Sequence, residues 1–243
     1  MTILVTNDDG DSVGVRILLD VAKKHGSPYA LIPHRQRSAV SKSLTLHKVL
    51  RITKKEPDVF EISGTPSDAV LFAVYSKEFQ RPELVLSGIN FGDNTSLDAI
   101  LSSGTIGACW EALMQGIPAI AFSYHRGSKE WKNTVYWGDL ELLKKWTTTV
   151  LEQLMKKMKK DVFYSVNFPK NLTNPKIIFT NTLQRTRFKV EIEKRLDPNE
   201  RPYYWLSGDF SKYVSGTDTA EVCEKNNIVI TEISLKNFEI RTK

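Results

Sequence analysis

Two adjacent acids, Asp8 and Asp9, follow the short apolar run at residues 3–6 and precede Gly10. Neighbouring carboxylates repel each other unless a cation or strong hydrogen-bond donors neutralise them. Magnesium and manganese bind carboxylate, amide, hydroxyl and water oxygens, so the pair indicates a site for a divalent ion. An Asp-Asp pair before a glycine also occurs in ordinary turns. The position of the pair in the fold must decide between a turn and an ion site.

Further oxygen-bearing side chains follow other predicted strands. Ser38 comes after the apolar run at residues 29–32, and Asn90 comes after the run at residues 84–87. In open α/β sheets, ligands bind beyond the carboxyl ends of the strands. The two acids should therefore meet Ser38 and Asn90 at one edge of the sheet. Their oxygens suit one hard divalent cation.

A possible anion site precedes a predicted helix at residues 105–115. Its residues are Ser102, Ser103, Gly104 and Thr105. The first N–H groups of a helix are unpaired and lie at the positive end of its dipole, which favours phosphate. Hydroxyl residues at this position can also serve only as helix caps. Together with a cation site at the same sheet edge, the segment indicates metal-assisted phosphoryl chemistry.

Short apolar runs alternate with helical patterns along the chain, which predicts an α/β fold with a mainly parallel sheet covered by helices on both faces. The predicted strands are residues 3–6, 29–32, 84–87, 119–122, 163–169, 189–196 and 227–233. The predicted helices are residues 15–24, 67–75, 105–115 and 139–160. The alternation at residues 189–196 is typical of a hairpin strand.

Composition excludes several classes of protein. The chain has 243 residues, 41% of them hydrophobic, which fits one large globular domain or a core with an extension. No apolar run approaches the roughly 20 residues of a membrane helix, and no export signal is visible, so we expect a cytoplasmic protein. The net charge of +6 comes largely from lysines near residue 160, with no nucleic-acid recognition motif, so we expect no stable nucleic-acid partner. Cys109 and Cys223 are expected to be reduced and buried.

Several longer segments resemble the SurE (survival protein E) family of 5′-nucleotidases, in the order of that family and over most of the chain. They are ILVTNDDG at residues 3–10, RSAVSKSLTL at 37–46, GTPSDAV at 64–70, LVLSGINFGDN at 84–94, SGTIGA at 103–108, DPNERPYYW at 197–205 and GTD at 216–218. The sequence departs from the family in four places: the loop between Gly10 and Gly14 is one residue shorter, Ser102 replaces an aromatic residue, Ala69 replaces a cysteine, and Ile32 stands before Pro33 where the family usually has alanine.

The resemblance implies a Rossmann-like core, hydrolysis of nucleoside 5′-monophosphates and one divalent ion, Mg²⁺ or Mn²⁺. It implies catalytic roles for Asp8 and Asp9. The implied metal ligands are Asp8, Asp9, Ser38 and Asn90, and the implied phosphate-binding residues are Asn94, Ser103, Gly104 and Thr105. Residues 1–243 would form a single domain, with a core at about 1–180. The remaining residues, about 181–243, would be exchanged or packed between subunits of a homodimer or homotetramer.

The sequence lacks the signatures of three other classes of nucleotide- or phosphate-binding enzyme. The Asp-x-Asp-x-Thr signature of haloacid-dehalogenase-type phosphatases is missing, and so are the glycine-rich motif of dinucleotide enzymes and the lysine-bearing phosphate loop. A broad-specificity phosphatase or exopolyphosphatase and a non-catalytic nucleotide sensor stay open. The sequence also leaves open whether an aspartate or a water attacks phosphorus. The four histidines are expected to have surface or packing roles.

Overall fold

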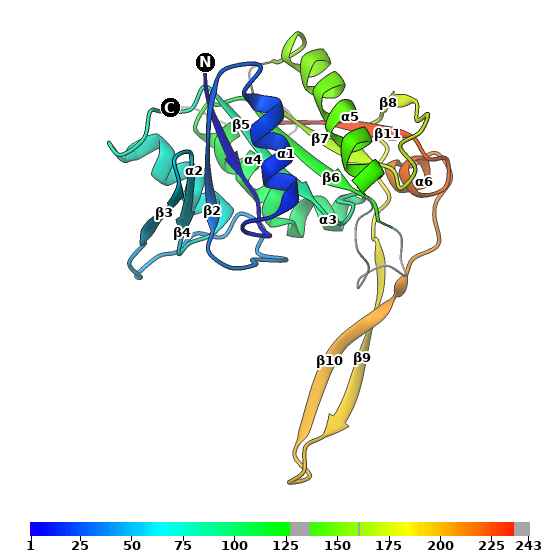
Figure 1. The fold of residues 1–243 in the computed structure, drawn as a ribbon. Helices are drawn as coiled ribbons and strands as arrows, with labels where there is room; N and C mark the ends of the chain where they lie inside the picture. Colours follow the sequence, from blue (N-terminus) through cyan, green and yellow to red (C-terminus); the bar gives the residue numbers. More distant parts are fainter. Residues whose placement is uncertain (127–136, 160, 236–243) are drawn as a thin grey trace, which may run out of the picture.

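The computed structural model describes residues 1–126, 137–159 and 161–235, and its centre is one nine-stranded sheet (Figure 1). The strand order is β3-β4-β2-β1-β5-β6-β7-β11-β8. The strands are β1 (Thr2–Thr6), β2 (Ser27–Pro33), β3 (Ile52–Glu56), β4 (Val59–Ile62), β5 (Leu84–Asn90), β6 (Ala119–Tyr124), β7 (Val162–Phe168), β8 (Ile177–Phe179) and β11 (Ile228–Ser234). Neighbours pair in parallel except β3 with β4 and β11 with β7. The prediction of a mainly parallel sheet is confirmed.

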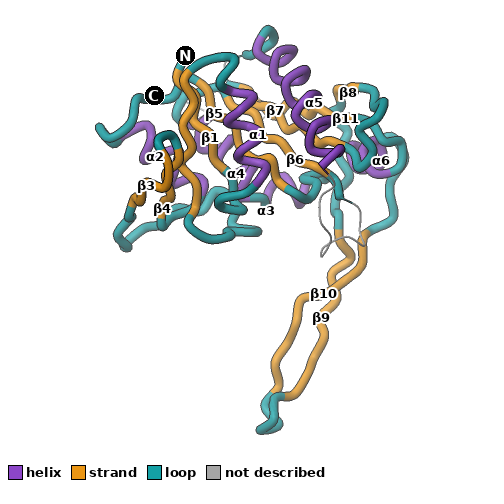
Figure 2. Tube along the Cα trace, viewed as in Figure 1, coloured by secondary structure: helices purple, strands orange, loops and turns teal. Residues whose placement is uncertain are grey.

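Helices cover both faces of this sheet, as predicted (Figures 1 and 2). On one face α1 (Val13–Ala22) and α5 (Trp137–Met155) pack in one hydrophobic cluster, and on the other α2 (Pro66–Tyr75) and α4 (Gly104–Met114) pack in a second. The central strand β1 divides its side chains between them: Ile3 and Val5 join the first cluster and Leu4 the second. This alternation is the period of two that a strand buried on both faces must have.

The register of the central strands sets the position of the site. Val5 of β1 pairs with Ala30 of β2 on one side and with Leu86 of β5 on the other, in parallel. The three strands therefore end side by side, and the loops that follow them start from the same edge of the sheet.

The structure contains every predicted strand and helix, and it adds elements that the sequence did not predict. These are β3, β4, β8, α3 (Leu97–Ser102), α6 (Asp218–Cys223) and β10 (Pro202–Phe210), for which no residue range was predicted. Strand β3 has the sequence Ile-Thr-Lys-Lys-Glu and lies at the sheet edge with four exposed residues, so no apolar pattern marked it. The prediction that α5 reaches residue 160 was wrong, since this helix ends at Met155.

The segment after β8 forms a long antiparallel hairpin, β9 (Phe188–Leu196) with β10 (Pro202–Phe210), which extends away from the body of the protein (Figures 1 and 2). The predicted C-terminal hairpin is thus confirmed. The chain then returns to the core, where β11 lies between β7 and β8. None of the helices in the described part of the chain is long and apolar enough to cross a bilayer.

Candidate active site

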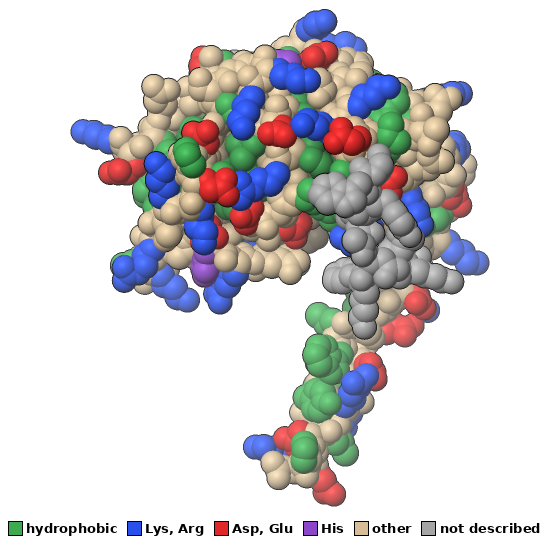
Figure 3. Space-filling view, viewed as in Figure 1, with side chains coloured by type: hydrophobic (Ala, Val, Ile, Leu, Met, Phe, Trp, Pro, Cys, Tyr) green, Lys and Arg blue, Asp and Glu red, His purple; other side chains and the backbone are tan. Residues whose placement is uncertain are grey.

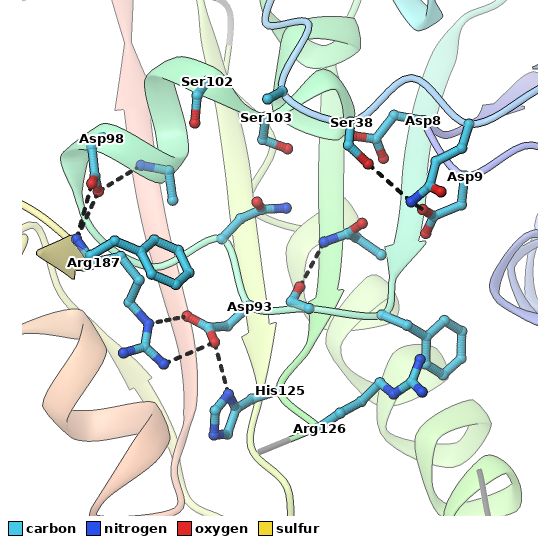
Figure 4. Close-up of a pocket in the computed structure, with 18 of the residues that line it drawn as sticks. Asp8, Asp9, Ser38, Asp93, Asp98, Ser102, Ser103, His125, Arg126 and Arg187 are labelled. Carbon is cyan, nitrogen blue, oxygen red and sulfur yellow. Dashed lines mark hydrogen bonds and ion pairs between the residues drawn. The ribbon is translucent and has the colours of Figure 1, made fainter. Parts of the chain in front are cut away.

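A pocket of about 680 Å³ lies at the carboxyl edge of the sheet (Figure 4). Seven residues of the predicted cation and anion sites line it: Asp8, Asp9, Ser38, Asn90, Asn94, Ser102 and Ser103. They come from the loops after β1 and β2, from the end of β5 and the loop after it, and from the junction of α3 with α4. Figure 4 shows the two acids beside Ser38 at one side of the pocket. The tertiary structure thus brings the predicted residues together.

Asn7 shapes the turn that carries the two acids. Its Oδ1 accepts a hydrogen bond from the N–H of Gly10 at 3.1 Å, and its Nδ2 donates to the carbonyl of Gly10 at 2.8 Å. Gly10 has a φ of +77°, a conformation that favours glycine. The N–H of Arg37 donates to the carbonyl of Asp8 at 2.7 Å. Because Ser38 follows Arg37, this bond holds the hydroxyl near the acids.

Asp8 is buried, with 5% of its surface exposed. The Thr105 hydroxyl donates to its Oδ1 at 2.6 Å. A Cβ at Gly104 would stand 2.8 Å from the Cβ of Asp8, so only glycine lets α4 begin this close to the carboxylate. Burial raises the pKa of Asp8 to about 6, against the opposing hydrogen bond from Thr105 and with a smaller contribution from Asp9. Ionisation of Asp8 is therefore more costly than in water when no cation is near.

Burial affects the pKa of Asp9 in the same direction as that of Asp8. Burial raises the pKa of this carboxyl, while a backbone N–H of Phe91, the Gln36 side chain and the charge of Arg126 lower it less. Gln36 hydrogen-bonds to two of the predicted metal ligands. Its Nε2 donates to Oδ1 of Asp9 at 3.4 Å and to Oγ of Ser38 at 2.9 Å.

The Asn90 side chain also presents an oxygen to this part of the pocket. Its Nδ2 donates to the carbonyl of Gly92 at 2.7 Å, so Oδ1 is the atom available to a cation. Two carboxylates with raised pKa values, one hydroxyl and one amide oxygen form a donor set that fits Mg²⁺ or Mn²⁺. A bound dication would stabilise both acids in their charged form.

A second group of possible ligands lies deeper: Asp93, His125 and Cys223, with ligand atoms within 4.8 Å of one another. This group fits a cation less well. The Arg187 guanidinium already approaches Asp93, with Nε 3.1 Å from Oδ1, and repels a second positive charge. Burial also raises the pKa of the Cys223 thiol to about 12, which keeps the sulfur protonated.

Of the predicted phosphate-binding residues, Asn94 and Ser103 line the pocket, whereas Gly104 and Thr105 do not. The hydroxyl of Ser103 caps α4 by accepting from the N–H of Ile106 at 3.3 Å. In the first turn of this helix, the N–H of Thr105 donates to the Asp8 carboxylate. Asn94 is fixed from two strands: its Nδ2 donates to Oγ of Ser123 at 2.9 Å, and its backbone N–H donates to Oδ1 of Asn167 at 2.8 Å.

Sequence reasoning missed an ionic network beside Asn94. His125, for which the sequence indicated only a surface or packing role, lines the pocket, and its Nδ1 lies 2.7 Å from Oδ2 of Asp93. Arg187 binds the same carboxylate with Nε and, at 3.3 Å, with Nη2. Burial alone would raise the pKa of Asp93, but His125 and Arg187 outweigh it and hold this pKa well below its usual value. His125 lies 32 residues from Asp93 in sequence and Arg187 lies 94 residues from it. No local sequence pattern therefore predicts this network.

Fold and site together define a Rossmann-like α/β protein whose pocket gathers oxygen-bearing side chains beside a helix N-terminus. The chain belongs to the SurE family: the family model described as "Survival protein SurE" matches residues 3–189.

Relatives and a solved structure support this assignment over nearly the whole chain. Proteins named "5′-nucleotidase SurE" from Pyrobaculum arsenaticum and Thermofilum pendens are each 37% identical, with 97% and 98% of this chain and 90% and 92% of the relative covered. A protein of that name from Hyperthermus butylicus is 38% identical over 96% of this chain and 84% of its own. The crystal structure of the SurE protein from Aquifex aeolicus has a TM-score of 0.78 and 29% identity, covering 97% of this chain and 94% of that one.

Proposed function

We propose that this protein is a divalent-metal-dependent phosphomonoesterase that hydrolyses nucleoside 5′-monophosphates to nucleoside and phosphate. The observation that carries the proposal is the buried Asp8 beside the partly buried Asp9, both with raised pKa values, in one pocket with the N-terminus of α4. A cation there would neutralise the acids, and the helix would hold an anion beside it. The names of the relatives support the same activity.

In this proposal Mg²⁺ or Mn²⁺ is held by Asp8, Asp9, Ser38 and Asn90. Bound there, the ion would offset negative charge on a phosphate oxygen. The N–H of Gly104, with Ser103 and Asn94, would hold the remaining phosphate oxygens and orient the ester. Thr105, which was predicted to bind phosphate, would act through Asp8, because its hydroxyl and its N–H both donate to that carboxylate.

Two mechanisms fit these residues: a water attacks phosphorus, or an aspartate does so and forms an aspartyl-phosphate. In both, the bond between phosphorus and the 5′ oxygen breaks and the nucleoside leaves after taking up a proton. A rapid-quench experiment with ³²P-labelled AMP separates them. Labelled protein at early times supports the aspartate route, and its absence supports the water.

The activity is tested by phosphate release from AMP with Mg²⁺, with Mn²⁺ and with excess EDTA. We expect release that depends on the metal and returns when metal is restored. Tight binding of AMP without release would contradict the proposal and indicate a sensor. Equal release from polyphosphate or unrelated phosphomonoesters would replace the nucleotidase with a broad-specificity phosphatase or exopolyphosphatase.

We also propose that residues 1–243 form one domain with a core at about 1–180, and that the hairpin in the remaining segment joins subunits in a homodimer or homotetramer. Beyond its first residue pair, the hairpin exposes hydrophobic side chains (Figure 3): Val190, Ile192, Leu196, Tyr203, Tyr204, Trp205 and Leu206. Apolar surface on a protruding arm favours burial against another chain. Light scattering should show an assembly that Trp205→Ser with Leu206→Ser dissociates, and a monomeric wild type would refute this.

The proposal includes a cytoplasmic location. Both cysteines are free, which is typical of a reducing compartment, and Cys109 is buried as expected, whereas Cys223 is only partly buried. Fractionation of cells that express the protein would test this location.

A further inference from the structure

The pocket extends beyond the part that the acids and α4 occupy, toward the root of the hairpin. Its volume of about 680 Å³ lies within the roughly 300–1,000 Å³ of pockets that hold whole small molecules. Figure 4 shows Arg187 and Asp98 on the opposite side from Asp8 and Asp9. Two aromatic residues at the hairpin root, Phe188 and Phe210, also line the pocket. The site therefore has an acidic end and an aromatic end.

The two aromatic rings form a pair at the first position of the hairpin. Phe188 begins β9 and is the register partner of Phe210, which ends β10. Their ring centroids lie 4.7 Å apart, with an interplanar angle of 32°. Phe188 is 48% exposed although it lines the pocket. One face of an aromatic pair is thus available to a ligand.

The backbone that carries Phe188 is held firmly to the core by Arg187. The N–H of Arg187 donates to both oxygens of Asp98, at 3.1 and 3.0 Å. The Arg187 side chain is 3% exposed and bound to Asp93. Its guanidinium lies 4.3 Å from the ring centroid of Phe210 and 5.4 Å from that of Tyr213. Phe188 therefore has a fixed position before any ligand enters, which reduces the entropy lost on binding.

The charges at this end disfavour an anion. Among the described residues, Asp93 and Asp98 both line the pocket there, and the guanidinium of Arg187 and the ring of His125 are both engaged by Asp93. A second phosphate or a polyphosphate chain would meet these two carboxylates and no free cation among the described residues that line this end. A flat, neutral, aromatic group would not.

From this arrangement we infer that the ring of Phe188, backed by Phe210, is a stacking surface for the nucleobase of the substrate. The inference rests on the proposed function, because it assumes that the phosphate occupies the acidic end. Every base has an aromatic face, so stacking on phenylalanine tolerates all of them. The protein should accept purine and pyrimidine monophosphates alike and prefer them to the same phosphate ester without a base.

The test compares Phe188→Ala with wild type on two substrates, AMP and ribose 5-phosphate, in saturating Mg²⁺ or Mn²⁺. Base stacking on an aromatic side chain is worth about 1–3 kcal/mol, which corresponds to about 5- to 150-fold. We expect kcat/KM for AMP to fall by that factor, mainly through a higher KM. The value for ribose 5-phosphate should stay within about twofold of wild type, and Phe188→Trp should retain activity on AMP.

Phe179→Ala is the matched control, because Phe179 is 45% exposed on β8 and does not line the pocket. It should leave both substrates unchanged. Equal losses on both substrates in Phe188→Ala, or no loss on either, would overturn the inference, as would a wild type that hydrolyses both equally well. If wild type released phosphate from neither substrate with metal, the proposed function itself would fail.

Discussion

The hydroxyl of Thr105 donates a hydrogen bond of 2.6 Å to Oδ1 of Asp8, across 97 positions of sequence. This bond joins the first turn of α4 to the loop after β1. It links the predicted phosphate-binding segment to the predicted metal ligands, so one hydroxyl serves both parts of the site.

Thr105→Val removes that donor and keeps the shape of the side chain. The hydrogen bond lowers the pKa of Asp8, so its loss should raise this pKa further and leave the carboxylate less well oriented. Mutation of a residue that hydrogen-bonds to a metal ligand typically weakens metal binding by about 10- to 100-fold. Titration calorimetry with Mn²⁺ should show a weakening of this size in Thr105→Val and near wild-type affinity in Thr105→Ser. Equal affinity in all three proteins would remove Thr105 from the site.

Asp8→Asn and Asp9→Asn should each lower kcat/KM for AMP by more than about 100-fold at saturating metal, since each removes a charged ligand. Circular dichroism should show an unchanged fold. Asp11→Asn is the control: this acid also lies in the loop after β1, but its carboxylate binds Arg16 at 2.8 Å and does not line the pocket. Activity retained in an Asp8 or Asp9 variant would exclude that residue from the mechanism.

The raised pKa of Asp8 predicts a pH-dependent stability of the metal-free protein. Burial moves this pKa from 3.8 to about 6, so between these pH values the native state holds a proton that the unfolded chain has lost. The free energy of unfolding therefore falls as pH rises through that window, by roughly 3 kcal/mol in total.

Asp8→Asn does not titrate there. In EDTA it should unfold at higher urea than wild type at pH 8, and the difference should shrink toward pH 4. Added Mn²⁺ should reverse the order by stabilising wild type. Identical urea midpoints at pH 8 in EDTA would show that the buried charge is not destabilising.

Arg187→Met should destabilise the protein strongly, because it leaves the Asp93 carboxylate buried and lacking its cation. Breaking a buried ion pair costs about 3–5 kcal/mol. Since the native pKa of Asp93 is held below its usual value, this contribution is present at neutral pH and is lost as pH falls below about 4. Urea unfolding at pH 7 measures the effect.

The double variant Asp93→Leu with Arg187→Met should recover much of the loss, because it removes both charges. A loss below about 1 kcal/mol in the single variant would mean that solvent or His125 compensates Asp93 fully.

The central strands and the residues that follow them could be predicted from local sequence patterns. Residues 3–6 and 84–87 read as buried strands because they are short and continuously apolar, and both lie in the central sheet. The carboxyl-edge rule then placed Asp8, Asp9 and Asn90 together with no knowledge of their contacts. Strand β3 escaped prediction because a charged edge strand carries no apolar period.

By itself, the sequence determined the α/β class, the acid pair at the end of the first strand and the hydroxyl-rich start of α4, because periodicity and helix-end chemistry act over a few neighbouring residues. Only the tertiary structure decided that Asp93, His125 and Arg187 form one network, and that Phe188 and Phe210 close the far end of the pocket. The spacing of apolar residues predicts which positions of a central strand or helix are buried. Each residue's partners depend on how distant segments pack, and no local spacing encodes that.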